Sequence, residues 1–212
     1  DREYDRWIFT QFSVSTKPYL QCVAVSTSGD PTGSYYRFAI NFGNSAFPDY
    51  PKLGIWPTGY FLSFNVFQGS FIGSRICAID RVAAVVTQSA PAPPTVICKQ
   101  LSASSGSTLP ADQDGRSPEG DPAFPELFMS IGTNALQAWT FTPNYSLPQS
   151  SVVTQLPNLA VPSFNRACGG GACVPQLGTK QQLDTLGDRL MYRLGYRKVG
   201  TTNYLVATHS VR

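Results

Sequence analysis

Short runs of β-branched and aromatic residues, separated by clusters of turn residues, recur along the chain. Residues 6–14, 20–26 and 34–42 have this composition, and Ser-Thr-Lys-Pro or Gly-Asp-Pro-Thr-Gly stands between them. Such runs bounded by Gly, Pro, Asp and Ser predict strands joined by turns. Because short turns can join only antiparallel neighbours, we expect these strands to form a meander.

The next stretch, residues 49–101, has the clearest pattern of a single sheet. Apolar runs at 53–56, 60–67, 74–79 and 95–101 predict four strands. Asp80 precedes Arg-Val-Ala-Ala-Val and is the expected N-cap of one helical turn. The last two strands carry Cys77 and Cys98, which we expect to be linked by a disulfide.

The C-terminal half alternates predicted hairpins with irregular stretches. Residues 102–122 are rich in Ser, Gly, Pro and Asp and predict a loop. Strands are expected at 124–131, 135–141 and 151–155, then a second irregular stretch at 157–182, then a hairpin of 189–196 and 203–210.

An Asp-Arg pair followed by bulky apolar residues occurs near both ends of the chain, at Asp5-Arg6 and Asp188-Arg189. Weaker copies at 58–64 and 120–124 give a mean period of roughly 60 residues. A repeat of that length carried by strands is typical of a β-propeller. We therefore predict an all-β fold, an incomplete propeller of three to four four-stranded antiparallel blades. The expected blades are 4–46, 49–101, 120–156 and 186–212, and the alternative is a β-sandwich.

Composition and charge exclude two classes of partner. Charged residues make up only 14% of the chain and its net charge is +3, without the basic stripe that a nucleic-acid interface requires. No stretch of eighteen apolar residues occurs, so no membrane span is expected. The opening Asp-Arg-Glu-Tyr-Asp fits a mature or excised chain.

The five cysteines indicate an oxidising compartment. Cys168 and Cys173 enclose a Gly-Gly-Gly-Ala loop, and together with the 77/98 pair they predict two local disulfides, with Cys22 left over. Zinc would need four clustered Cys or His ligands, whereas the chain has one His, at 209. We therefore predict a secreted, extracellular protein.

Residues 28–35, Ser-Gly-Asp-Pro-Thr-Gly-Ser-Tyr, resemble the Asp-box turn of the sialidase-like propeller superfamily, in which the box is structural. Asp30 is accordingly expected to be a turn residue. Over nearly its whole length the chain is similar to a group of uncharacterised secreted bacterial β-propeller proteins. Cys-Val-Ala-Val-Ser-Thr-Ser-Gly-Asp (22–30), Asp-Tyr-Pro-Lys-Leu-Gly-Ile-Trp-Pro (49–57), Leu-Pro-Ala-Asp-Gln-Asp-Gly (109–115) and Asp-Arg-Leu-Met-Tyr-Arg (188–193) carry that resemblance. It implies fold and export, and no activity.

Candidate chemistry centres on repeated aspartates. Hydrolysis of a glycosidic bond needs two carboxylates facing each other. Asp49, Asp5 and Asp188 are the candidate catalytic acids, at matching points of their units. The neighbouring basic and aromatic side chains are the candidate ligand-binding residues: Arg6, Arg189, Lys52 and Tyr50.

A calcium ion is the one cofactor that the sequence suggests. Asp112-Gln-Asp114-Gly has the spacing of a calcium-loop turn, although the remaining EF-hand ligands are missing. The alternative is a solvated acidic loop. No hydrolytic triad is indicated, because the single His lacks a nucleophile motif.

Three functions are compatible with this pattern. The first is a secreted propeller module for recognition or assembly, which binds carbohydrate or another extracellular ligand. The second is an extracellular glycoside hydrolase or lyase that uses Asp49 with Asp5 or Asp188. The third is a structural piece of a larger propeller, completed by further blades from a longer chain or from another subunit.

Overall fold

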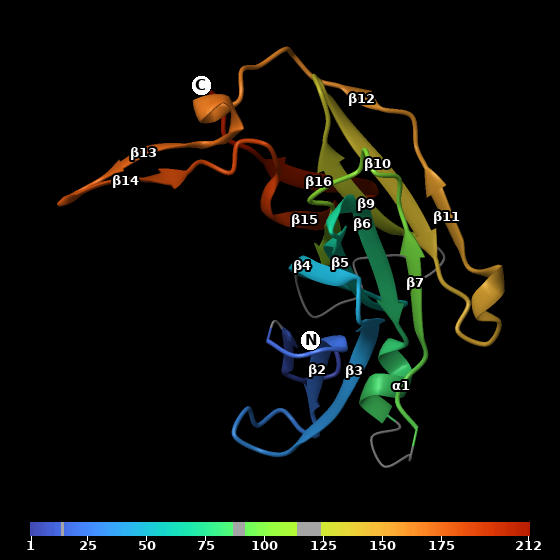
Figure 1. The fold of residues 1–212 in the computed structure, drawn as a ribbon. Helices are drawn as coiled ribbons and strands as arrows, with labels where there is room; N and C mark the ends of the chain where they lie inside the picture. Colours follow the sequence, from blue (N-terminus) through green and yellow to red (C-terminus); the bar gives the residue numbers. More distant parts are fainter. Residues whose placement is uncertain (14, 87–91, 114–123) are drawn as a thin grey trace.

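The structure is a computed structural model that describes residues 1–13, 15–86, 92–113 and 124–212 (Figure 1). Its first sheet contains β1 (Ile8–Phe12), β2 (Tyr19–Ser26) and β3 (Tyr35–Gly43), in that order. Its second sheet contains β4 (Phe47–Trp56), β5 (Gly59–Gln68), β6 (Ser70–Ile79) and β7 (Val96–Gln100), also in chain order. All neighbours in these two sheets are antiparallel. The predicted meander and the predicted four-stranded sheet are both confirmed.

The predicted helical turn after the third strand of the second sheet is also present. Helix α1 spans Arg81–Val86. The carboxylate of Asp80 accepts a hydrogen bond of 3.0 Å from the Ala83 N–H, as an N-cap residue does. Asp80 therefore lies between the last residue of β6 and the first residue of α1, and it caps α1.

The third sheet joins two regions that the sequence suggested as separate units. It contains β8 (Leu109–Gln113), β9 (Glu126–Ile131), β10 (Ala135–Thr142), β11 (Val152–Gln155), β12 (Leu159–Ala160), β15 (Met191–Val199) and β16 (Thr202–Thr208). The order is β11-β10-β9-β8-β15-β16, with β12 also on β10. A parallel pairing of β8 with β15 makes the connection. Strands of the expected units 120–156 and 186–212 therefore belong to one sheet, in which β8 pairs with both β9 and β15.

Two stretches predicted to be irregular contain strands. Strand β8 lies inside 102–122. A separate hairpin of β13 (Ala172–Gln176) and β14 (Thr179–Asp184) begins inside 157–182 and ends two residues beyond it. Two short 3-10 helices, η1 (Pro148–Ser150) and η2 (Ala167–Gly170), complete the elements. In Figure 1 the β13–β14 hairpin extends away from the three larger sheets.

The second sheet forms the middle layer of the molecule. Strand β5 is buried on both faces from Gly59 to Val66. Its Leu62 and Phe64 pack with Val23 and Val25 of the first sheet in one hydrophobic cluster, while its Phe61 packs with Phe128 and Phe141 of the third sheet in another. The three sheets thus lie face to face, an arrangement common to neighbouring propeller blades and to a layered sandwich.

Strands β4 and β8 approach so closely that only glycine fits at Gly54. A Cβ there would collide with the carbonyl oxygen of Ala111 and lie 2.9 Å from the Cβ of Pro110. The contact holds the first strand of the second sheet against β8, next to β15. Among the helices that the structure describes, none is long and apolar enough to cross a membrane.

Candidate functional site

A bulge in β4 shapes the region that holds most of the predicted ligand-binding residues. The register between β4 and β5 shifts between Asp49 and Lys52, and Tyr50 within this bulge has a φ of 54°. A positive φ is unfavourable for a bulky residue, and bulges commonly redirect a side chain near a binding site. The bulge thus holds Tyr50 in a backbone conformation that regular sheet pairing does not require.

Two cations lie against the ring of Tyr50. Lys52 Nζ is 3.5 Å from the ring centroid and Arg189 Cζ is 4.9 Å from it. Both distances are within the roughly 6 Å of a cation–π interaction. The Arg189 guanidinium also donates two hydrogen bonds to the Asp188 carboxylate, of 2.8 and 2.9 Å. The strand β4 and the turn before β15 therefore meet in one charged and aromatic cluster.

Burial and neighbouring charges set the protonation of this cluster. The hydrogen bond from Arg189 holds the pKa of Asp188 below its usual range, so this carboxyl is ionised at neutral pH. Burial and the charge of Arg189 lower the pKa of Lys52, which Asp49 partly offsets. Burial raises the pKa of the Tyr50 hydroxyl, which therefore stays protonated. The cluster combines a fixed anion, two cations and an aromatic ring.

A hollow of about 320 Å³ adjoins the cluster, and we call it the Arg189 pocket. Its main lining residues are Phe67, Phe71, Ser107, Arg166, Asp188 and Arg189. The volume is at the lower end of the roughly 300 to 1,000 Å³ typical of small-molecule sites. The lining of this hollow thus combines aromatic and charged side chains.

The floor of the pocket is held by a reciprocal pair of hydrogen bonds. Asn65 Nδ2 donates to Ser107 Oγ at 3.1 Å, and the Ser107 N–H donates to Asn65 Oδ1 at 2.7 Å. Ser63 on the same strand donates to the Thr108 carbonyl. These contacts fix the segment before β8 on β5 and keep the floor polar.

Arg166, the third charged residue of the pocket lining, closely precedes the loop closed by the Cys168–Cys173 disulfide. The hydroxyl of Thr185 donates to the carbonyl oxygens of Ala167 and Gly171, at 2.9 and 3.2 Å. A Cβ on Gly170 would touch both Asp188 Cβ, at 3.6 Å, and Arg166 Cδ, at 3.7 Å. The disulfide loop is thus docked on the turn before β15, beside the Asp188–Arg189 pair.

The structure brings together four of the sequence-predicted residues and separates two others. Tyr50, Lys52, Asp188 and Arg189 are in the cluster. Asp49 is next to it, and its carboxylate accepts the Tyr50 N–H at 2.8 Å.

Asp5 and Arg6 lie instead in the N-terminal turn. There Arg6 donates to the Tyr4 and Asp5 carbonyls at 3.0 Å, and the Asp5 carboxylate lies against Gly29. The two Asp-Arg pairs therefore have different roles, and Asp121 of the third copy lies outside the described residues.

Asp112, half of the predicted calcium turn, is engaged in protein contacts. Its carboxylate pairs with Arg193 at 2.5 Å and accepts the Ile55 N–H at 3.1 Å, so it ties β8 to β15 and β4. Asp114 lies outside the described residues. Within the described ranges no three His, Cys, Asp or Glu side chains form a group that could hold a metal ion. The calcium hypothesis stays a prediction.

Both predicted disulfides are present. Cys77 and Cys98 face each other across β6 and β7, and Cys22 is exposed on β2. Asp30 is a turn residue as expected, since its carboxylate accepts the N–H and the hydroxyl of Thr32 at 2.8 and 2.7 Å.

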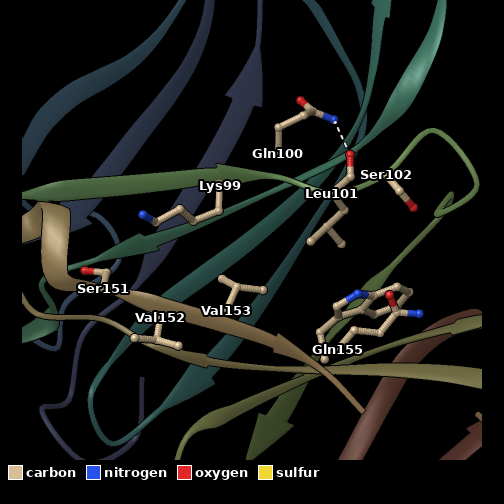
Figure 2. Close-up of a pocket in the computed structure, with 9 residues that line it drawn as sticks. Lys99, Gln100, Leu101, Ser102, Ser151, Val152, Val153 and Gln155 are labelled. Carbon is tan, nitrogen blue, oxygen red and sulfur yellow. Dashed lines mark hydrogen bonds between the residues drawn. The ribbon is translucent and has the colours of Figure 1, made fainter. Parts of the chain in front are cut away.

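A second hollow, of about 520 Å³, lies between the edge strands β7 and β11. Figure 2 shows Lys99 and Gln100 on one side of it and Val152 and Val153 on the other. The amide of Gln100 donates to the carbonyls of Ile72, Ser74 and Leu101 and accepts from Arg75. The Gln100 amide is thus committed to the fold. The Arg189 pocket, whose lining includes three charged side chains, is the stronger candidate.

No protein family, curated protein or solved structure matches the chain.

Proposed function

We propose that the protein is a secreted β-propeller module that recognises carbohydrate at the Arg189 pocket. The observation that carries this proposal is Tyr50, held at positive φ in a strand bulge with Lys52 and Arg189 against its ring. Strained backbone conformations cluster at functional sites. We therefore attribute the strained position of Tyr50 in a charged and aromatic cluster to ligand recognition. The adjoining pocket offers the space.

The pocket lining has an apolar part and a polar part, which match the C–H face and the hydroxyl groups of a sugar ring. Phe67 and Phe71, whose ring centroids are 5.5 Å apart, provide an apolar wall for the C–H face of a pyranose. Ser107 and the arginines provide donors and acceptors for hydroxyl groups. Small-molecule sites generally combine apolar walls with a few placed polar groups in this way.

Export is supported by the two disulfides, since structural disulfides persist mainly in oxidising compartments. The propeller is supported by the first two sheets, which are antiparallel meanders packed on each other through one hydrophobic cluster, whereas the third sheet departs from a blade by its parallel β8–β15 pair. A propeller needs radial repetition to protect its sheet faces and edges. Sheets of the described kind would form part of such a ring.

The open face of the first sheet is where another blade would pack. A groove of about 690 Å³ there is lined by Phe9, Ala24 and Ala39 among others, and Phe9 is 56% exposed. A blade from a longer chain or from another subunit would cover it, as the third predicted function requires. A crystal structure of the naturally occurring polypeptide tests this, and a face left in solvent with no ring around it would refute the propeller.

Glycoside hydrolysis is the second candidate, because Asp49 and Asp188 both act electrostatically on the Tyr50–Lys52 cluster. The lowered pKa of Asp188 suits a base or nucleophile and not a proton donor. Glu126, whose pKa burial raises, does not line the pocket. We therefore favour carbohydrate recognition over glycoside hydrolysis. Release of new reducing ends from a bound saccharide would instead favour hydrolysis.

A glycan array tests the recognition proposal directly. Labelled protein is applied to immobilised saccharides alongside its Tyr50→Ala variant. We expect a defined set of saccharides to bind the wild type and to bind the variant more weakly. A blank array, or one on which the two proteins behave alike, would overturn the proposal.

A further inference from the structure

We infer that the Arg189 pocket selects saccharides that carry a carboxylate, such as uronic acids, and that Arg166 is the residue that reads the carboxylate. This inference rests on the proposed function and names the ligand class of the same site. It also assigns a role to a residue that the sequence pattern did not single out.

The two guanidinium groups that line the pocket differ in their hydrogen bonding. Arg189 has two of its donor nitrogens, Nε and Nη2, directed to Asp188. Arg166 lines the same pocket, is exposed, and makes no side-chain hydrogen bond to any described residue. A planar fork of N–H groups that makes no hydrogen bond within the described residues matches the two oxygens of a carboxylate.

The net charge of the pocket lining is positive. Two arginines and one aspartate line the pocket, and they leave one positive charge when all three are ionised. Arg166 also contributes to the lowered pKa of Asp188, so the two side chains are close enough to interact. A single carboxylate entering beside Arg166 balances this charge, whereas a neutral sugar leaves it unbalanced.

The backbone that carries Arg166 is anchored by its neighbours. Arg166 is two residues before Cys168, and the disulfide loop that follows is fixed on Thr185 and next to Gly187. The backbone of Arg166 forms a bridge to Val211, and the Arg212 N–H donates to the Asn165 carbonyl at 2.9 Å. An arginine on a backbone anchored at both sides loses less conformational freedom when it binds a ligand.

The opposite wall defines how the sugar ring would lie. Phe67 near the end of β5 is paired with Phe71 near the start of β6. Gly106 leaves room for the Phe71 ring, because a Cβ there would be 3.2 Å from Phe71 Cζ. A pyranose packed on this aromatic wall directs its substituents toward the arginines. The carboxylate at C6 of a uronic acid is such a substituent.

The test compares uronic-acid saccharides before and after their carboxyl groups are reduced to alcohols. Calorimetry measures the affinity of each panel for the wild type and for Arg166→Gln, Arg166→Lys and the surface control Lys180→Gln. We expect carboxyl reduction to weaken binding to the wild type at least tenfold and Arg166→Gln to weaken binding of the acidic panel by a similar factor. Arg166→Lys should fall between them, because it keeps the charge and loses the fork, and the control should match the wild type.

Three results would count against the inference, and they are distinguishable. Equal binding of the acidic and reduced panels overturns carboxylate selection and leaves sugar recognition standing. A carboxylate preference that survives in a folded Arg166→Gln protein overturns the role of Arg166. Failure of every acidic and neutral saccharide to bind overturns the proposed function together with this inference.

Discussion

The guanidinium carbon of Arg189 lies 4.9 Å from the centre of the Tyr50 ring. The contact connects the strand β4 to the turn before β15, far apart in the sequence. It also explains why a bulky residue occupies a backbone position that favours glycine, since the bulge aims the ring at the arginine. The site is thus built across two sheets.

Replacing Tyr50 should weaken saccharide binding through Arg189. Tyr50→Ala removes the cation–π contacts, which are worth about 1 kcal/mol at a half-exposed site, or about fivefold in affinity. Tyr50→Phe keeps the ring and should bind nearly as well as the wild type. Calorimetry measures both, with the exposed Tyr204→Ala as the control. Equal losses for the Phe and Ala variants would show that the hydroxyl, and not the ring, matters.

Substitutions of Tyr50 should affect the stability of the protein and its saccharide binding differently. Glycine adopts a positive φ freely, whereas other residues pay about 1 to 2 kcal/mol there. Tyr50→Gly should therefore be more stable than Tyr50→Ala by about 1 kcal/mol in urea unfolding, while both bind saccharide weakly. If alanine proves the more stable variant, the backbone at this bulge is not strained.

Glu126 should make the folded protein less stable as the pH rises. Burial raises its pKa well above the ordinary value, reinforced by Asp112 and opposed by the amides of Ala111 and Leu127. The folded protein keeps this proton where the unfolded chain has lost it. The free energy of unfolding therefore falls as the pH rises above the unfolded pKa of about 4.3, by at most about 1.4 kcal/mol per pH unit.

Glu126→Gln removes the ionisable proton and should abolish this decline. We expect it to be more stable than the wild type at pH 8 by about 1 to 3 kcal/mol, and the difference to shrink at pH 5. Urea unfolding at the two pH values measures it. Identical pH dependence in the two proteins would show that Glu126 does not titrate in this way.

Much of the fold follows from local patterns in the sequence. The first two sheets were predictable because their strands alternate with strong turn signals, and Asp80 caps α1 as its position indicates. Strand β8 was missed because it is short, contains Pro110 and follows a Ser-rich segment. The β14 strand, Thr179–Asp184, is exposed along its whole length, so it lacks the apolar alternation that marks a half-buried strand.

The site was only partly predictable. Tyr50, Lys52 and Arg189 could be chosen as residue types beside repeated acids, yet their meeting depends on the β8–β15 pairing, which no local pattern encodes. The repeat assigned equal roles to Asp5 and Asp188, although only Asp188 pairs with its neighbouring arginine. Arg166 was missed because it lies in an irregular stretch, and its nearness to the Cys168 loop was the available signal.

Loss of the 168/173 disulfide and loss of the 77/98 disulfide should have different effects on saccharide affinity and on stability. Replacing both cysteines of the 168/173 pair by serine frees the loop that closely follows Arg166, so affinity for acidic saccharides should fall with a stability loss of about 2 kcal/mol. The same change at the 77/98 pair should cost about 3 kcal/mol, because the closed loop is longer, and leave the affinity of the folded protein intact. Calorimetry and urea unfolding of both double variants separate these effects, and the reverse pattern would contradict the role of the loop.

A crystal structure of the protein soaked with the saccharide that binds best tests the account most directly. The account predicts electron density for a sugar ring in the Arg189 pocket, on the Phe67 and Phe71 rings, with its acidic group at Arg166. A saccharide bound at another surface, with the pocket empty, would contradict it.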